Sequence, residues 1–100
     1  AFTSTGGMHS GNEITLINLL LPFFQHGMVL AGVPHSVPEL VRTVKGGSPY
    51  GASAVTGFDG TRGVDENELA IARALGARVA RLAGQIRPEP ASVELAAYEN

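Results

Sequence analysis

The pattern of hydrophobic and polar positions predicts two long helices, separated by short strands and glycine-rich loops. The first apolar segment runs from Ile14 to Phe24 and leaves almost no polar face. A helix that is apolar all round is buried on more than one side, and an isolated domain of this size cannot easily provide that burial. We therefore expect a helix from about residue 12 to Gln25, part of which faces another subunit.

Residues suited to helix ends bound this first helix. Either Asn12 or Ser10 can cap its start, and Glu13 suits the positive end of the helix dipole. Pro22 falls in the last turn and is expected to bend or end the regular hydrogen bonding. Gly27 is a natural residue just beyond the helix, where a left-handed conformation is common.

The clearest helix is expected from Asp65 to Ile86. Asp65 and Glu68 have the spacing of a capping box. Apolar residues recur every three or four positions along one face: Leu69, Ala72, Leu75, Val79, Leu82 and Ile86. This spacing predicts a helix that lies on a sheet with its other side in water.

Three short segments have the composition of strands. Residues 1–5 contain Phe and Thr, which favour a strand. Residues 28–34 predict a buried strand closed by a proline, and residues 52–56 predict a further short strand. A strand, a helix and a strand in this order predict a right-handed βαβ crossover. The connection at 35–47 contains a possible helical turn at 38–41.

A small polar loop lies between the first strand and the first helix. It consists of Ser4, Thr5, Gly6, Gly7, Met8, His9, Ser10 and Gly11. Its glycines allow close approach of the backbone to a ligand, and the helix start supplies free N–H donors. A strand, such a loop and a helix start form a ligand site at the carboxyl edge of an α/β sheet. The local pattern fits a tight connection without a ligand equally well.

Composition narrows the function classes. Hydrophobic residues make up 44% of the 100 residues and charged residues only 16%, so we expect part of the surface to be hidden against another body. The net charge of −2 and the single lysine, Lys45, argue against nucleic acid or an anionic membrane as a partner. There is no apolar run long enough to span a membrane and no cysteine. These features are typical of a cytoplasmic protein.

The histidines do not form a recognisable catalytic or metal motif. His9, His26 and His35 lack the spacing of metal ligands, so no metal site is predicted. The segment around Ser10 does not match the G-x-S-x-G nucleophile elbow, which argues against a hydrolase. Tyr50 and Phe58 lie beside glycines, where they either flank a substrate pocket or pack within their own loops.

Four motifs in order identify a family resemblance. They are residues 3–13, residues 25–28 (Gln-His-Gly-Met), residues 46–52 (Gly-Gly-Ser-Pro-Tyr-Gly-Ala), and residues 57–62 with 66–73. The chain resembles the WrbA family of flavodoxin-like, FMN-dependent NAD(P)H:quinone oxidoreductases. The resemblance covers roughly residues 2–86 and leaves a tail at 87–100. It matches only the carboxyl-terminal half of the family, without the loop that holds the FMN phosphate.

This resemblance implies a fold, an activity and an assembly. The fold would be an α/β, three-layer αβα parallel sheet, of which residues 1–86 supply strands four and five with their helices. Residues 4–11 would bind FMN through backbone N–H groups, and His26 matches the histidine at the flavin site, where it would be catalytic. The reaction would be two-electron reduction of quinones by NAD(P)H through FMN. The family is usually tetrameric, so we expect a homo-oligomer.

His26 presents a geometric problem for this assignment. A helix from residue 12 to 25 rises about 20 Å, which places His26 far from residues 4–11 of the same chain. From the sequence alone, His26 is better explained as a helix-end residue that complements the dipole. If it reaches a flavin, we expect either a flavin of a neighbouring subunit or a much shorter helix.

Two alternatives to an enzyme remain. One is a non-catalytic flavodoxin-like module that binds FMN and carries electrons. The other is an α/β fragment with no independent function, which without the phosphate loop would have no useful affinity for FMN.

Overall fold

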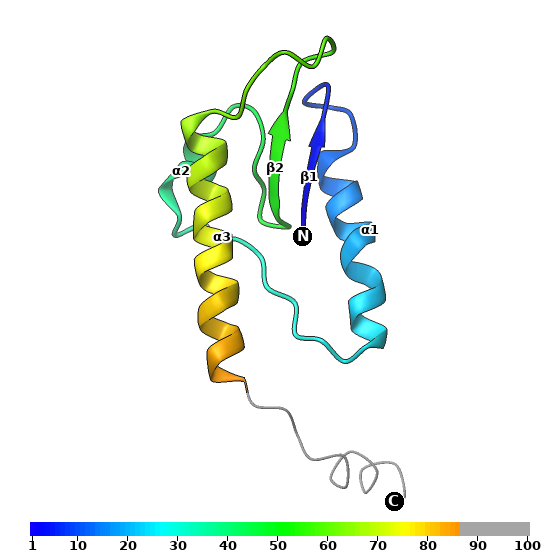
Figure 1. Cartoon of the computed structure of the whole chain (residues 1–100), viewed down its shortest axis with the longest axis vertical. Helices are drawn as coiled ribbons and strands as arrows, with labels where there is room; N and C mark the ends of the chain where they lie inside the picture. Colours follow the sequence, from blue (N-terminus) through cyan, green and yellow to red (C-terminus); the bar gives the residue numbers. More distant parts are fainter. Residues whose placement is uncertain (87–100) are drawn as a thin grey trace, which may run out of the picture.

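The computed structural model describes residues 1–86, so the predicted tail at 87–100 lies outside the described residues. The elements in chain order are β1 (Phe2–Thr5), α1 (Asn12–Gln25), α2 (Pro38–Arg42), β2 (Ala52–Val55) and α3 (Glu66–Gln85). Helix α1 packs on β1, whereas α3 packs on both β2 and α2 (Figure 1). The chain is thus a small α/β structure, and both long helices occur where they were predicted.

The two strands form a parallel sheet. Phe2 pairs with Ala52 and Thr5 pairs with Val55, so both strands end at the same edge. The connection between the two strands contains α1 and α2. The parallel βαβ arrangement expected from the sequence is therefore present, although its second strand is β2.

The apolar segment at 28–34 was predicted to be a buried strand, and this prediction is wrong. The segment is irregular backbone between α1 and α2. Between residues 29 and 33, the only backbone hydrogen bond among the described residues runs from Val33 N–H to the carbonyl of Pro49, at 2.9 Å. A strand requires a neighbour along its length, and no described strand lies beside this one. Apolar composition alone therefore does not produce a strand here.

The carboxyl end of α1 follows the prediction, but its start does not. Gly27 has a φ of 71°, and its N–H and that of Met28 donate to Phe24 and Phe23 respectively, which is the Schellman arrangement. The N-cap is Gly11, with a φ of 87° and no side-chain cap.

Ser10 and Asn12 were both candidate caps for α1, and neither occupies that position. The N-cap residue adopts the left-handed conformation, which glycine enters without a steric penalty. Asn12 is instead the first helical residue, and only 8% of its surface is exposed. A glycine cap leaves the first N–H groups of α1 without a side-chain acceptor.

The start of α3 was predicted correctly, and its buried face was predicted in part, because Leu75 is buried and Ala72 packs against the core. Asp65 is the N-cap and forms a complete capping box with Glu68. The residues that face the core are Glu68, Ile71 and Leu75, whereas Leu69 is 41% exposed and Val79 is 46% exposed. Apolar residues occupy two neighbouring stripes of this helix, and spacing alone does not decide which stripe faces the sheet.

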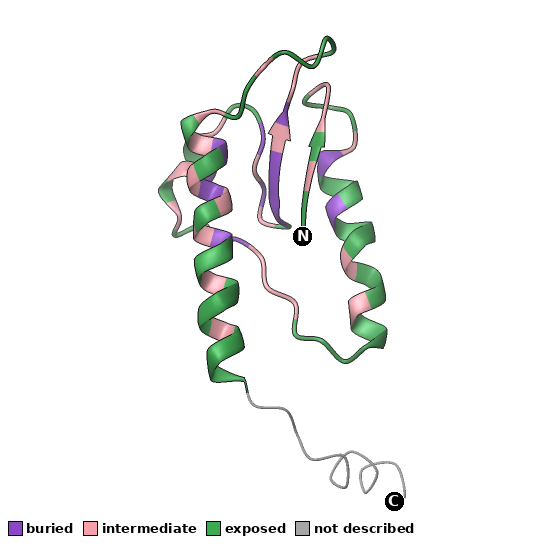
Figure 2. Ribbon diagram, viewed as in Figure 1, coloured by how far each residue is buried: buried purple, intermediate pink, exposed green. Residues whose placement is uncertain are grey.

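The core is small and lies where α3, α2 and β2 meet. It contains Val33, Leu40, Ala52, Ile71 and Leu75. In α1, by contrast, Asn12 and Leu16 are the buried residues, and large apolar side chains elsewhere on that helix are exposed (Figure 2). They are Ile14, Ile17, Leu19, Leu21 and Phe24. The expected covering subunit stays a prediction.

Neither of the long helices within residues 1–86 combines the length and the apolar character that crossing a membrane would require.

Candidate functional site

Two loops meet at the carboxyl edge of the sheet. The first follows β1 at residues 6–11, and the second follows β2 at residues 56–63 (Figure 1). Thr56 ties them together, because its N–H and its hydroxyl both donate to the carbonyl of Thr5, at 2.8 and 3.2 Å. The carboxyl edge is where α/β sheets of this kind bind ligands.

The loop at residues 6–11 is an exposed turn with free donors. The hydroxyl of Thr5 donates to the carbonyl of Gly7 at 2.8 Å, and the N–H of Ser10 donates to the same carbonyl at 3.3 Å. Four consecutive N–H groups of this loop have no acceptor among the described residues: those of Gly6, Gly7, Met8 and His9. These groups are available to the oxygen and nitrogen atoms of a ligand.

Phe58 lies against the glycines of the first loop. A Cβ atom built on Gly7 would come within 2.8 Å of Phe58 Cζ and within 2.8 Å of Ser10 Oγ. A Cβ atom on Gly6 would come within 3.2 Å of Phe58 Cδ1. The rest of the Phe58 side chain faces solvent, since 91% of it is exposed. Glycine at positions 6 and 7 therefore leaves room for the Phe58 side chain of the same chain.

The base of the second loop is fixed by Arg62. Its guanidinium lies 2.9 Å from Glu68 and 2.6 Å from Asp65, and it also donates to the carbonyl of Val55. The N–H of Arg62 donates to the carbonyl of Thr56 at 2.8 Å. These contacts fasten the loop that contains Phe58 to the end of β2 and to the start of α3.

Glu68 is the buried centre of this arrangement, with 2% of its surface exposed. Its Oε2 accepts from the N–H groups of Gly46 and Val55, at 2.9 and 2.8 Å. Its Oε1 accepts from Arg62 and from the N–H of Asp65, at 2.9 and 3.0 Å. Burial by itself raises the pKa of Glu68, but these hydrogen bonds outweigh burial and hold the pKa below its usual value.

A cavity of about 480 Å³ lies between the start of α1 and residues 45–53. Its lining includes Asn12, Lys45, Ser48 and Ser53, together with Met8 and neighbouring residues of the first loop and of α1. The Oδ1 atom of Asn12 is buried in this structure without a hydrogen-bond partner. The volume of this cavity falls within the range of small-molecule sites.

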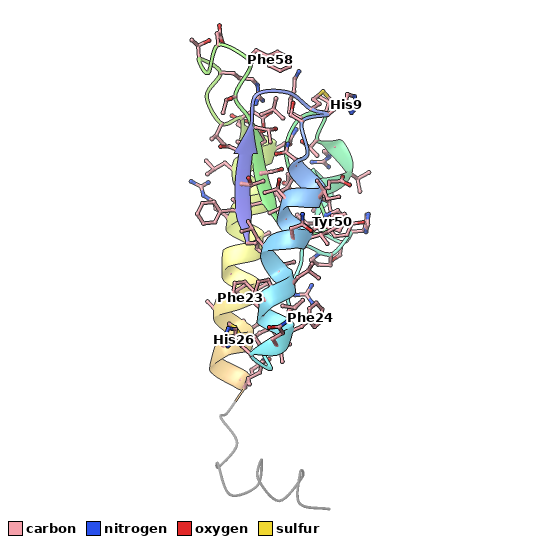
Figure 3. The ribbon with its side chains drawn as sticks, turned by 90° about the vertical axis from the view of Figure 1, so that its right-hand side faces the viewer. His9, Phe23, Phe24, His26, Tyr50 and Phe58 are labelled. Carbon is pink, nitrogen blue, oxygen red and sulfur yellow. The ribbon has the colours of Figure 1, made fainter. Side chains whose placement is uncertain are left out.

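The structure brings most of the predicted cofactor residues to one edge and leaves His26 at the other end. Ser4, Thr5 and the loop at residues 6–11 form the carboxyl end of β1 and its continuation. In Figure 3, His9 and Phe58 lie at one end of the molecule, and His26 lies at the opposite end beside Phe23 and Phe24. Because α1 extends to Gln25, the shorter-helix explanation for His26 is excluded.

Tyr50 and Phe58 do not flank one pocket. Tyr50 lies well apart from Phe58, nearer the middle of the molecule (Figure 3), and its N–H donates to Ser48 Oγ at 3.2 Å. The capping role of Glu68 was predicted, but its burial as a hydrogen-bond acceptor was not. The contacts of Arg62 and the place of Lys45 on the cavity lining were not predicted either. Arg62 contacts residues at most seven positions away, but no recognised motif marks these contacts. The place of Lys45 depends on the distant residues of the first loop and of α1 that line the same cavity.

Within residues 1–86, no three His, Cys, Asp or Glu side chains are grouped so as to hold a metal ion.

Comparison with known proteins gives consistent matches. A protein of Chromohalobacter salexigens named NAD(P)H dehydrogenase (quinone) is 46% identical over 88 residues, which cover 86% of this chain and 44% of that protein. A protein of the same name from Sinorhizobium fredii has the same identity and coverage. One from Trichlorobacter lovleyi is 42% identical over 87 residues, which cover 85% of this chain and 43% of that protein. No family model matches the chain.

The chain therefore spans less than half the length of these curated relatives. The similarity nevertheless extends over most of this chain at an identity that does not arise by chance. The resemblance inferred from the four sequence motifs is confirmed to this extent: over about 86% of its length, the chain is similar to proteins named NAD(P)H dehydrogenase (quinone).

Proposed function

We propose that this chain is the carboxyl-terminal half of an FMN-dependent enzyme that transfers two electrons from NAD(P)H to quinones. The observation that carries the proposal is the similarity of the chain to proteins named for that reaction. The free N–H groups of the loop at residues 6–11 support it, because they lie at the edge where α/β sheets bind ligands.

The described residues fit the ring of FMN but not its phosphate. Consecutive N–H groups from Gly6 to His9 suit the oxygen and nitrogen atoms along one edge of the ring. An isoalloxazine is flat and largely apolar, and the exposed side chain of Met8 supplies an apolar neighbour. The phosphate requires a second set of donors, which we assign to the remainder of the longer protein.

In this proposal, the protein binds and orients while the cofactor supplies the chemistry. Bound FMN would supply two-electron chemistry, the transfer of a hydride equivalent from NAD(P)H to a quinone, and the N–H groups of residues 6–9 would hold its ring. Thr5 stabilises the turn at Gly7 through its hydroxyl, and Phe58 supports the same turn from outside. His26 would act on the flavin of a neighbouring subunit, since it lies far from residues 4–11 of its own chain (Figure 3).

The proposal includes a homo-oligomer, which the exposed apolar face of α1 supports. Side chains such as Ile14 and Phe24, which are 61% and 64% exposed, are stabilised when another surface covers them. A homotetramer would cover them and bring His26 of one subunit to the flavin of another. The alternative, a non-catalytic electron carrier, requires neither a quinone pocket nor this histidine.

The test uses the natural polypeptide that contains this chain, loaded with FMN. Oxidation of NADH and of NADPH is followed at 340 nm with benzoquinone as the acceptor. We expect turnover with at least one of these two co-substrates. A yellow protein that retains FMN but gives no turnover would favour the electron carrier. A protein that binds no FMN would overturn the proposal, and sedimentation of the same sample gives the oligomeric state.

A further inference from the structure

The cavity between the start of α1 and residues 45–53 has the properties of a ligand site. Gly11, Asn12, Glu13 and Ile14 line it from α1. The first helical N–H group with an acceptor is that of Thr15, which donates to the carbonyl of Gly11 at 2.9 Å. The N–H groups before it in α1 are therefore free, and they carry the positive end of the helix dipole.

Asn12 gives an independent indication of a ligand. Its side chain lines the cavity and 92% of its surface is buried, yet Oδ1 has no donor within reach. A buried acceptor without a donor is costly, and such groups are normally paired. Residues 1–86 supply no donor, so the group that pairs with Oδ1 comes from outside this part of the chain. That group must itself donate a hydrogen bond.

The rest of the lining favours an anion beside that donor. Lys45 contributes an ammonium group and has no carboxylate within 4.0 Å among the described residues. Ser53 accepts from the N–H of Gly47 at 2.7 Å, so its hydroxyl proton remains available. Helix N–H groups, an ammonium and a hydroxyl together form an anion site.

A ligand that meets both requirements carries hydroxyl donors next to a phosphate. We infer that this cavity binds the phosphorylated ribose of the nicotinamide co-substrate, with the phosphate at Lys45 and the start of α1 and a ribose hydroxyl on Asn12. This inference rests on the proposed function, which supplies a dinucleotide as a substrate. A volume of about 480 Å³ accommodates a ribose phosphate.

The negative charge of Glu13 should weaken phosphate binding, so removal of this charge and removal of the Lys45 charge should have opposite effects on the affinity. Its carboxylate is on the same lining, where it repels an anion but interacts favourably with the helix dipole. Removal of this charge is therefore expected to strengthen phosphate binding, whereas removal of the Lys45 charge weakens it. A site that recognises only shape would respond to neither change.

Direct titration of the natural polypeptide with ribose 5-phosphate tests the site without reference to turnover. We expect binding that Lys45→Gln weakens about tenfold, the loss of one charge-assisted hydrogen bond, and that Glu13→Gln strengthens. Arg42→Gln is the matched control, because Arg42 is an exposed cation nearby that does not line the cavity. Equal effects of Lys45→Gln and Arg42→Gln, or no binding by the unaltered protein, would overturn the inference.

Asn12→Leu separates a ligand role from a structural one. Leucine of similar size removes a buried unpaired acceptor, so the thermal midpoint should hold or rise while ribose 5-phosphate binding weakens. Binding of inorganic phosphate should be much less affected by this change. A lower thermal midpoint together with unchanged ribose 5-phosphate binding would assign Asn12 to folding alone and overturn the ribose contact.

In an active enzyme, Lys45→Gln should raise the KM for NAD(P)H and leave both the KM for quinone and the affinity for FMN unchanged. A weaker affinity for FMN would assign the cavity to the flavin instead and overturn the inference. If the enzyme proves inactive, the proposed function fails, but the ribose 5-phosphate titration remains readable. The two failures are thus distinct.

Discussion

The guanidinium of Arg62 lies 2.9 Å from the buried carboxylate of Glu68, in the loop that follows β2. Glu68 also accepts from the N–H groups of Gly46, Val55 and Asp65. One side chain therefore joins three segments: the turn after α2, the end of β2 and the start of α3. Because Arg62 and Phe58 belong to the same loop, this carboxylate also helps to fix the loop that carries Phe58.

Glu68→Gln should destabilise the fold by about 3 kcal/mol, because the amide NH₂ would face two donors that now have an acceptor. The pKa of Glu68 is lower in the folded chain than its usual value, so its contribution is present above about pH 4.3. The contribution is lost as pH falls from there toward the folded pKa. Chemical denaturation of both proteins between pH 3 and 7 measures this difference.

The stability difference between Glu68→Gln and the unaltered protein should therefore shrink as the solution becomes acidic. Asp59→Asn is the control, because hydrogen bonds from Thr61 also lower the pKa of Asp59 but its carboxylate is exposed to solvent. That variant should change stability little at any pH. A difference for Glu68→Gln that stays constant down to pH 3 would contradict this account.

Phe58→Ala should weaken FMN binding about tenfold while leaving the thermal midpoint almost unchanged. The ring supports Gly6 and Gly7 from outside, but 91% of it is exposed, so its loss uncovers little apolar surface. Quenching of flavin fluorescence measures the affinity. Phe2→Ala is the matched control, since Phe2 is 81% exposed at the other end of β1. Equal FMN affinities for the two variants would refute a role for Phe58 in the loop.

Gly7→Ala should push the exposed Phe58 ring away from the loop, because the new Cβ would lie 2.8 Å from Phe58 Cζ. We expect weaker FMN binding and a smaller penalty when Phe58→Ala is also present, since the ring is then absent. Gly63→Ala is the control, because no atom lies within 4 Å of a Cβ at that position. A double-mutant cycle on the FMN affinity measures the coupling. Additive effects would show that ring and glycine act independently.

The sequence predicted the features of the fold that depend on local pattern. Both long helices, the capping box of Asp65 and the glycine after α1 follow from spacing and from capping chemistry within one segment. The polar loop between β1 and α1 was predicted to lie at the carboxyl edge of the sheet, because a strand followed by a helix places it there.

Features that depend on partners from distant segments were not predictable. Residues 28–34 have the apolar composition of a strand, but no described strand lies beside them. Leu69 matches the helical stripe, yet Ile71 faces the core because the stripe that packs is determined by β2 and α2. Glu68 is recognisable as a capping residue, but its burial depends on Gly46, 22 positions away.

His26 provides the last prediction, because the structure places it at the opposite end of α1 from the loop that is proposed to hold the flavin (Figure 3). If it serves the flavin of a neighbouring subunit, His26→Ala should lower kcat without lowering the FMN content. The FMN-loaded natural polypeptide is the sample, and the visible spectrum gives its flavin content. A variant with normal turnover would show that His26 takes no part in the reaction.

Mixed oligomers distinguish a shared site from a site within one subunit. His26→Ala keeps the flavin loop, whereas Gly7→Val should strongly weaken flavin binding, because its branched side chain lies on the loop that is proposed to hold the flavin and would push Phe58 and Ser10 aside. Each variant alone should be nearly inactive. After joint refolding, a His26→Ala subunit that retains its flavin can receive His26 from a Gly7→Val neighbour, so activity should return. With a site inside one subunit, no mixed oligomer contains a complete site, and activity would stay absent.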